Sequence, residues 1–187
     1  MTHSLAPTLL VAMPSLLDPN FFRSVVLLVT HDAGGAFGII VNRELDVTVA
    51  SVCEAVDVPW RGDAHRRALL GGPVEPQHGW VLHRSGHLFE GELSVRAEDG
   101  AVLGLSPSQG ALEMYGREPD GDFRLVMGYA GWGAGQLDAE LAAGAWLTAP
   151  VQSGLVFERP PGAVWKETLA SIGVDPARLV DAGTSVN

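Results

Sequence analysis

The amino-acid sequence predicts one domain of mixed α and β structure, on three observations. The chain has 187 residues, a length that suits one domain with a substantial core. Hydrophobic residues make up 47% of it and charged residues 18%, which excludes a long disordered chain. Short β-branched runs alternate with amphipathic stretches, and no linker or repeat separates them. We therefore assign residues 1–187 to one domain, in which 174–187 is a weakly periodic, loosely ordered tail.

The N-terminal part of the chain predicts three strands and a helix. The strands are the apolar runs 8–13, 25–30 and 36–41. Between the last two, His31 to Gly35 contains two glycines and predicts an antiparallel hairpin. Within 48–56 apolar side chains recur with helical spacing, and either Asp46 or Thr48 can serve as the N-cap.

The remainder predicts six short strands and three helices. The strands are expected at 68–70, 80–83, 88–95, 102–105, 124–129 and 145–150, and the helices at 107–116, 136–143 and 161–172. Ser85-Gly86 predicts a turn between the second and third of these strands. Ser106 followed by Pro107 predicts an N-cap and a first helical residue.

A glycine-dense segment at 128–135 is the most prominent local pattern. Its four glycines surround Trp132 between a predicted strand and a predicted helix. Two interpretations stay open: a ligand-binding loop whose backbone N–H groups hold an anion, and a close-packed turn with Trp132 as a core plug. The spacing matches neither the Rossmann nor the Walker pattern. Asp138 and Glu140 also place negative charge at the helix start, which weakens the first interpretation.

Asn42 and Arg43 follow the predicted strand 36–41 directly, where a buried strand reaches the surface. Two interpretations stay open here as well. Asn42 can satisfy turn backbone while Arg43 pairs with Glu44 or Asp46, or the guanidinium can supply the positive charge of a binding site.

Catalytic and metal-binding patterns are weak. The histidines His78, His83 and His87 are close in sequence, and His83 and His87 could meet across a hairpin beside Glu90, but no thiolate completes a zinc site. A hydrolytic triad could be assembled only from Ser24, His31 and Asp18 or Asp32, without a nucleophile-elbow pattern. The single cysteine, Cys53, lies on the apolar phase of a helix and predicts a buried side chain. We assign no catalytic residue, metal ligand or cofactor.

The overall charge restricts the class of partner. The formal net charge is −10, so the field of the protein repels phosphate backbones and disfavours direct nucleic-acid binding. No apolar run approaches the roughly 20 residues of a membrane-spanning helix. The first residues lack the pattern of a signal peptide, so we expect a cytoplasmic protein. Lys166 is the sole lysine among 12 basic residues, which we attribute to codon bias.

Several motifs occur in the order typical of one bacterial family. They are Ala12-Met13-Pro14, Asp18-Pro19-Asn20-Phe21, Ser24-Val25-Val26, Gly38-Ile39-Ile40-Val41-Asn42-Arg43, Gly71-Gly72-Pro73-Val74, Leu82-His83, the glycine segment and Trp146-Leu147. Together they resemble the AlgH-like family from about Leu9 to about Ile172. The resemblance implies an α+β fold with a mixed, bifurcated β-sheet rolled into a pseudo-barrel and flanked by short helices. It implies no agreed biochemical activity.

The resemblance singles out motif positions, namely Asn42, Arg43, Gly72, His83, Trp132 and Gln136. With Gly131 and Gly133 of the glycine segment, these are our candidate ligand-binding residues. Our leading hypothesis is a non-catalytic regulatory or adaptor domain that binds a protein partner or a small ligand. One alternative is an enzyme that acts on an anionic small molecule, with His83 as acid or base. The other is a transcriptional regulator, because the family name implies a genetic link to control of alginate production. The oligomeric state is not predicted.

Overall fold

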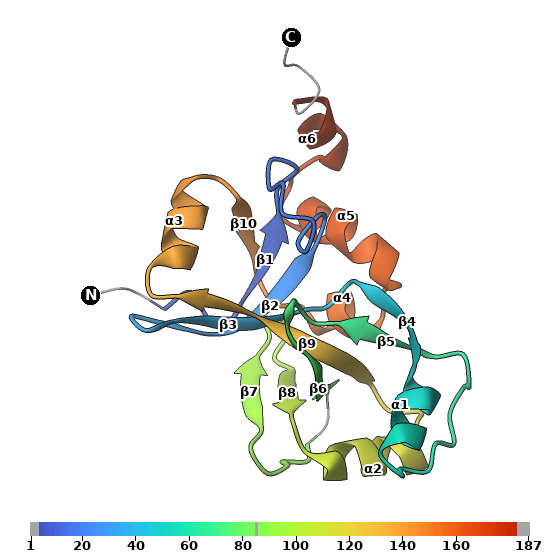
Figure 1. Ribbon diagram of the computed structural model, residues 1–187. Coiled ribbons are helices and arrows are strands. Elements are labelled where there is room, and N and C mark those ends of the chain that lie inside the picture. Colours follow the sequence, from blue (N-terminus) through green and yellow to red (C-terminus); the bar gives the residue numbers. More distant parts are fainter. Residues whose placement is uncertain (1–3, 85, 183–187) are drawn as a thin grey trace.

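A computed structural model describes residues 4–84 and 86–182 (Figure 1). Its strands are β1 (Thr8–Ala12), β2 (Val25–Asp32), β3 (Gly35–Ile40), β4 (Glu44–Thr48), β5 (Arg67–Leu70), β6 (Val74–His83), β7 (Leu93–Arg96), β8 (Val102–Ser106), β9 (Phe123–Gly133) and β10 (Trp146–Ala149). Its helices are α1 (Val49–Ala55), α2 (Gln109–Arg117), α3 (Gln136–Ala142), α4 (Ser153–Phe157), α5 (Pro161–Ser171) and α6 (Pro176–Ala182). The predicted α+β class is confirmed.

The ten strands form one branched sheet. Its main path runs β10-β1-β2-β3-β9-β6-β8-β7, and a side branch carries β5 and β4. The path does not close on itself, so the rolled sheet only approximates a barrel. The predicted hairpin is confirmed, since β2 and β3 pair antiparallel from Val26 and Ile40 to Asp32 and Gly35.

The branch point lies on β9, the long strand that crosses the middle of Figure 1. Along one edge β9 pairs with β5 at Val126 and Met127 and then with β3 over residues 130–133. Its other edge pairs with β6. The glycine segment is therefore mostly strand, and the prediction of a turn from residue 128 was wrong. Only 134–135 form the turn, where Gly135 begins α3 in a left-handed conformation.

Glycines are required where the two branches separate. Gly128 has φ +74°, and a Cβ there would lie 2.6 Å from the carbonyl oxygen of Gly72. A Cβ on Gly72, at φ +153°, would collide with the carbonyl group of Tyr129. The Gly71 N–H donates to Met127, and the Gly71 carbonyl accepts from Ile40. Close backbone contacts, with no side chains between them, thus join β9 and β3 to the Gly71-Gly72 segment that links β5 to β6. We call this branch point the fork of the sheet.

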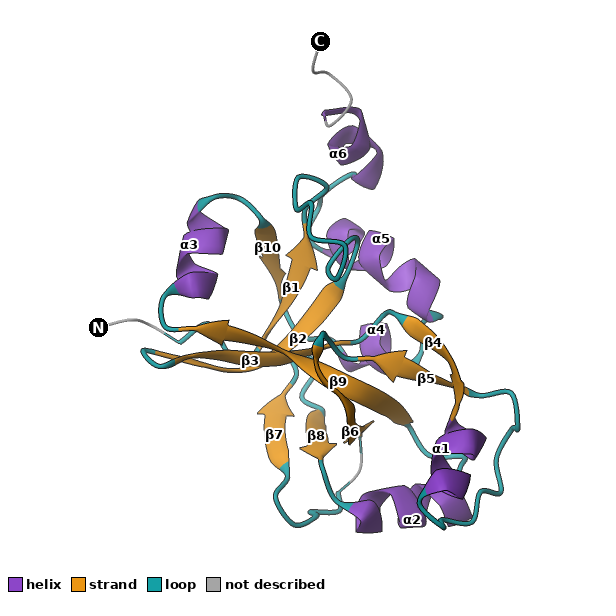
Figure 2. Ribbon diagram, in the orientation of Figure 1, coloured by secondary structure: helices purple, strands orange, loops and turns teal. Residues whose placement is uncertain are grey.

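Short helices cover the sheet in three places (Figure 2). α4 and α5 pack on one face through residues that include Val156, Trp165 and Leu169. α3 packs on the opposite face of β1 and β2 through Leu137. α1 and α2 cover the other end of the sheet and bury Cys53, as predicted. β1 is buried on both faces, which explains its uninterrupted apolar sequence.

Several local predictions were wrong. β7 pairs with β8, and β6 pairs with β8 and β9, so the segments around His83 and His87 do not form the predicted hairpin. Ser85 of its predicted turn lies outside the described residues. Ser108 caps α2 by accepting from the Gly110 N–H, so the cap lies two residues beyond Ser106. Thr48, one of the two predicted caps, does cap α1.

Four elements were not predicted from the sequence: β4, the first half of β6, α4 and α6. α6 lies within the predicted tail, of which 183–187 fall outside the described residues. Among the residues that the structure describes, no helix has the length and apolar character needed to cross a membrane.

Candidate functional site

Asn42 and Arg43 hold the β1–β2 loop (residues 13–24) in one conformation. The Arg43 guanidinium donates to the carbonyl oxygens of Pro19, Asn20 and Phe22, at 3.3, 2.6 and 2.8 Å. Asn42 accepts from the Val25 N–H and donates to the Arg23 carbonyl. The Asn42 side chain therefore satisfies backbone hydrogen-bonding groups of the loop, as one interpretation predicted. Arg43 does not bond to Glu44 or Asp46; Asp46 instead pairs with Arg67.

The opposite side of the same loop is anchored by an aromatic cluster. Phe21 packs against Trp132 and Trp146, with ring centroids 6.1 and 5.4 Å apart. Both indole N–H groups donate to Oε2 of Glu140, and the Gln136 amide donates to Oε1. Trp132 is only 6% exposed. Trp132 is therefore a buried core residue, as the second interpretation of the glycine segment proposed.

A basic cavity of about 310 Å³ lies where this loop meets the start of α5. Its lining consists of Phe22, Arg23, Asn42, Arg43, Pro161, Gly162, Trp165 and Lys166. The volume is at the lower end of the range for small-molecule sites. Three cations and no carboxylate line it, although the net charge of the protein is −10. This charge pattern suits an anion.

The three cations are held in different ways. The Arg23 guanidinium lies 5.2 Å from the ring centroid of Phe22 and 5.4 Å from that of Trp165. Burial lowers the pKa of Arg43, and the Asp18 charge opposes that shift. Lys166 is exposed, and within residues 4–84 and 86–182 it makes no ion pair. The neighbouring acid on α5, Glu167, is engaged by Arg159. The positive charge of the cavity is therefore only weakly compensated.

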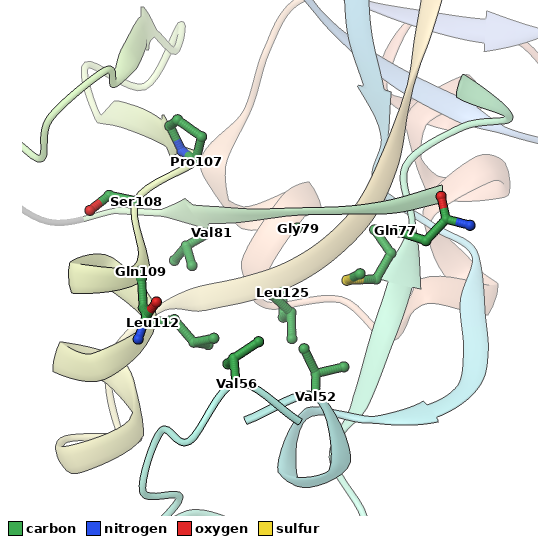
Figure 3. Close-up of a pocket in the computed structure, with 11 residues that line it drawn as sticks. Val52, Val56, Gln77, Gly79, Val81, Pro107, Ser108, Gln109, Leu112 and Leu125 are labelled. Carbon is green, nitrogen blue, oxygen red and sulfur yellow. The ribbon is translucent and has the colours of Figure 1, made fainter. Parts of the chain in front are cut away.

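A smaller apolar cavity lies between α1, α2 and the sheet (Figure 3). Its volume is about 170 Å³. Val52, Val56, Val81, Leu112 and Leu125 point into it, and Gly79 of β6 adds no side chain to the lining. Gln77, Ser108 and Gln109 supply the polar groups of the lining. The cavity is smaller than typical ligand pockets and carries no charged group in its lining.

The eight sequence-predicted positions fall into four places. Asn42 and Arg43 line the basic cavity. Gly131, Trp132, Gly133 and Gln136 belong to the end of β9 and the start of α3, where the Gln136 side chain accepts from the Gly133 N–H. Gly72 lies at the fork of the sheet.

His83 occupies the fourth place and is 0% exposed. Its Nε2 lies 2.9 Å from Oε2 of Glu92, and its ring packs against Phe89 and Tyr115. The four places do not form one cleft: His83 and Trp132 are buried in separate clusters, and Arg43 faces the basic cavity.

The groups proposed for a hydrolytic triad are engaged elsewhere. The Ser24 hydroxyl donates to the Phe21 carbonyl. His31 accepts from the Leu5 N–H through Nδ1, and its Nε2 lies 3.5 Å from Asp138. These partners do not assemble the triad. In the described part of the chain, no group of three or more His, Cys, Asp or Glu residues could hold a metal ion.

Sequence reasoning missed the part of the basic cavity that α5 supplies. Pro161, Trp165 and Lys166 lie more than 100 residues from Arg43. Helical periodicity predicted the helix at 161–172 but could not say which loop would lie beside it. Lys166 is the sole lysine in the chain, but nothing in the sequence linked it to Arg43.

Comparisons with known proteins agree with this fold. The profile of the AlgH-like family matches residues 9–177. A UPF0301 protein of Stenotrophomonas maltophilia strain K279a is 42% identical over 181 residues, with 95% of this chain and 94% of the relative covered. A UPF0301 protein of Anaeromyxobacter sp. strain K is 41% identical over 186 residues, with 96% and 93% covered.

Two solved structures are also similar to this chain. The solution structure of AlgH from Pseudomonas aeruginosa has a TM-score of 0.76 and 33% identity, and covers 100% of this chain and 99% of its own. A crystal structure of a protein from Corynebacterium diphtheriae has a TM-score of 0.68 and 25% identity, with 92% and 88% covered. The profile match spans most of the chain, and the chain belongs to the AlgH-like family.

Proposed function

We propose that this chain is a non-catalytic, cytoplasmic regulatory or adaptor domain that binds an anionic ligand in the basic cavity. The observation that carries the proposal is the grouping of Arg23, Arg43 and Lys166 around one cavity without a lining carboxylate. In a protein of net charge −10 such a site offers an anion local positive charge within an overall negative field.

The surroundings favour binding over catalysis. Arg43 and Asn42 are fixed by hydrogen bonds to the loop, and Arg23 is fixed between two aromatic rings. The lining contains no His, Ser, Cys, Asp or Glu that could serve as a nucleophile or a general base near neutral pH. The basic cavity is therefore suited to holding a ligand in a defined orientation.

Thermal unfolding in the presence of small anions tests the proposal. Citrate and pyrophosphate should raise the melting temperature of the wild-type protein in a concentration-dependent way, because a ligand that binds only the folded state stabilises it. Lys166→Gln should reduce the shift, whereas Arg96→Gln, an exposed charge on β7, should leave it unchanged. Equal shifts in all three proteins, or none, would contradict an anion site in this cavity.

A further inference from the structure

The basic cavity also has an apolar wall that a simple anion would not use. Phe22 is 55% exposed although its ring lines the cavity, and Pro161 and Trp165 lie in the same lining. Leaving a large aromatic side chain exposed forgoes hydrophobic stabilisation. A ligand that covers Phe22 would recover it. The lining therefore suits a ligand in which negative charges lie next to an apolar group.

The exposed aromatic ring is presented by a fixed loop. Arg43 bonds to three carbonyl groups of the β1–β2 loop, and Ser24 donates to the Phe21 carbonyl through both its N–H and its hydroxyl. Phe21 is held between Trp132 and Trp146 on the other side. Because these contacts already hold the loop, little conformational entropy should be lost when a partner covers Phe22. A single conformation also favours specific recognition.

The β1–β2 loop exposes a second large apolar side chain outside the basic cavity. Leu17, on the same loop, is 89% exposed and does not line the cavity. A small anion in the cavity would leave it uncovered. A polypeptide can place acidic and apolar side chains on one face and contact both regions, as docked peptide segments do. Three weakly compensated cations beside this surface select a segment of negative charge.

We propose that the β1–β2 loop and the start of α5 form a docking surface for an acidic segment of a protein partner. The carboxylates of the segment bind Arg23, Arg43 and Lys166, and one of its apolar side chains covers Phe22. This inference rests on the proposed function, because it uses the same cavity and names its ligand as an acidic, apolar peptide.

Selection from a random heptapeptide display library tests the inference with an unbiased probe. Peptides selected on the wild-type protein should combine at least two acidic residues with an aromatic or a large aliphatic residue. The consensus peptide, labelled and titrated by fluorescence polarisation, should bind at least tenfold more weakly to Phe22→Ala and to Lys166→Gln. Circular dichroism spectra of both variants establish that they are folded.

Matched controls separate this surface from general charge and hydrophobicity. Leu88→Ala removes an apolar side chain that is 82% exposed elsewhere, and Arg96→Gln removes an exposed charge on β7. Both should bind the consensus peptide as the wild type does. A second peptide with glycine in place of its apolar residue should bind equally to wild type and Phe22→Ala.

The outcomes distinguish the inference from the proposed function. Suppose that citrate binding depends on Lys166, but the selected peptides lack acidic residues or bind Phe22→Ala as tightly as the wild type. The peptide inference is then overturned and the anion site stands. If selection enriches no peptide over an empty support, the inference is likewise overturned. If neither citrate nor acidic peptides respond to Lys166→Gln, both proposals fail.

Discussion

Arg43 shows how one side chain can determine the shape of a surface. Its guanidinium bonds to three backbone carbonyls of the β1–β2 loop and still lines the basic cavity. Neutral carbonyl acceptors do not cancel its charge. Arg43 therefore fixes the loop and places positive charge at the cavity at the same time, whereas the predicted pairing of Arg43 with Glu44 or Asp46 is not formed.

Arg43→Lys separates these two contributions. Lysine retains the charge but lacks the planar fork that reaches three carbonyls, so the free energy of unfolding should fall by about 1.5–3 kcal/mol. Urea denaturation measures this change. Arg96→Lys is the control, because the Arg96 side chain donates one long bond of 3.4 Å to Gly100. A loss no larger than that of the control would show that the Arg43 bonds do not stabilise the loop.

Asp99 gives a prediction about pH. Its carboxylate accepts from the hydroxyl and the N–H of Ser153 and from the Ala101 N–H, and the Ser153 hydroxyl makes the largest contribution to lowering the pKa of Asp99. A lowered pKa in the folded state stabilises the protein above the ordinary aspartate value of about 3.9, and this contribution is lost as pH falls toward the lowered pKa.

Asp99→Asn should therefore be less stable than the wild type at pH 7, and the difference should shrink as the pH falls below about 4. Urea unfolding of both proteins across this range measures the difference. A gap that stays constant from pH 7 down to pH 3 would contradict the assigned role of the charged carboxylate.

At the scale of elements, the glycine segment shows where sequence patterns mislead. Glycine density is typical of a turn, yet β9 continues to Gly133 because residues 130–133 pair with β3. At Gly128 the glycines let β9 and the Gly71-Gly72 segment approach backbone to backbone. That approach involves residues more than 50 positions apart, which local propensity does not register. Segments with β-branched runs and clear punctuation, such as the β2–β3 hairpin, were predicted correctly.

Two glycine substitutions in the same sheet should have opposite effects. Gly128→Ala places a Cβ 2.6 Å from the Gly72 carbonyl oxygen at φ +74°, so we expect a loss of at least about 2 kcal/mol. In Gly79→Ala the added Cβ lies beside the apolar cavity, 3.6 Å from Met127 Sδ. This change should raise the free energy of unfolding by about 0.4–1 kcal/mol. Denaturant midpoints measure both. Similar effects of the two changes on stability would contradict the close backbone contact between Gly128 and Gly72.

At the scale of the whole molecule, the basic cavity is built from segments far apart in the chain. The β1–β2 loop supplies Phe22 and Arg23, the connection between β3 and β4 supplies Asn42 and Arg43, and α5 supplies the rest of the lining. The sequence could single out Asn42 and Arg43 as candidate residues because a motif and a position after a strand are local features. It could not identify Lys166, since no pattern within α5 specifies the loop that packs beside it.

The charge of the basic cavity is opposite to the net charge of the protein. Although the net charge of the protein is −10, three of its 12 basic residues line the basic cavity, and no carboxylate lies in that lining. Anion binding there should weaken as ionic strength rises, because the cavity is open to solvent and its cations are screened.

The most direct test of the central claim is to locate a bound anion by two-dimensional ¹H–¹⁵N NMR during a citrate titration in 0.15 M salt, about the physiological ionic strength. If an anion binds in the basic cavity, the backbone signals of Arg23, Asn42, Gly162 and Lys166 shift saturably, and these shifts are lost in Lys166→Gln. Saturable shifts confined to the surroundings of the apolar cavity, or shifts that do not saturate, would contradict this claim.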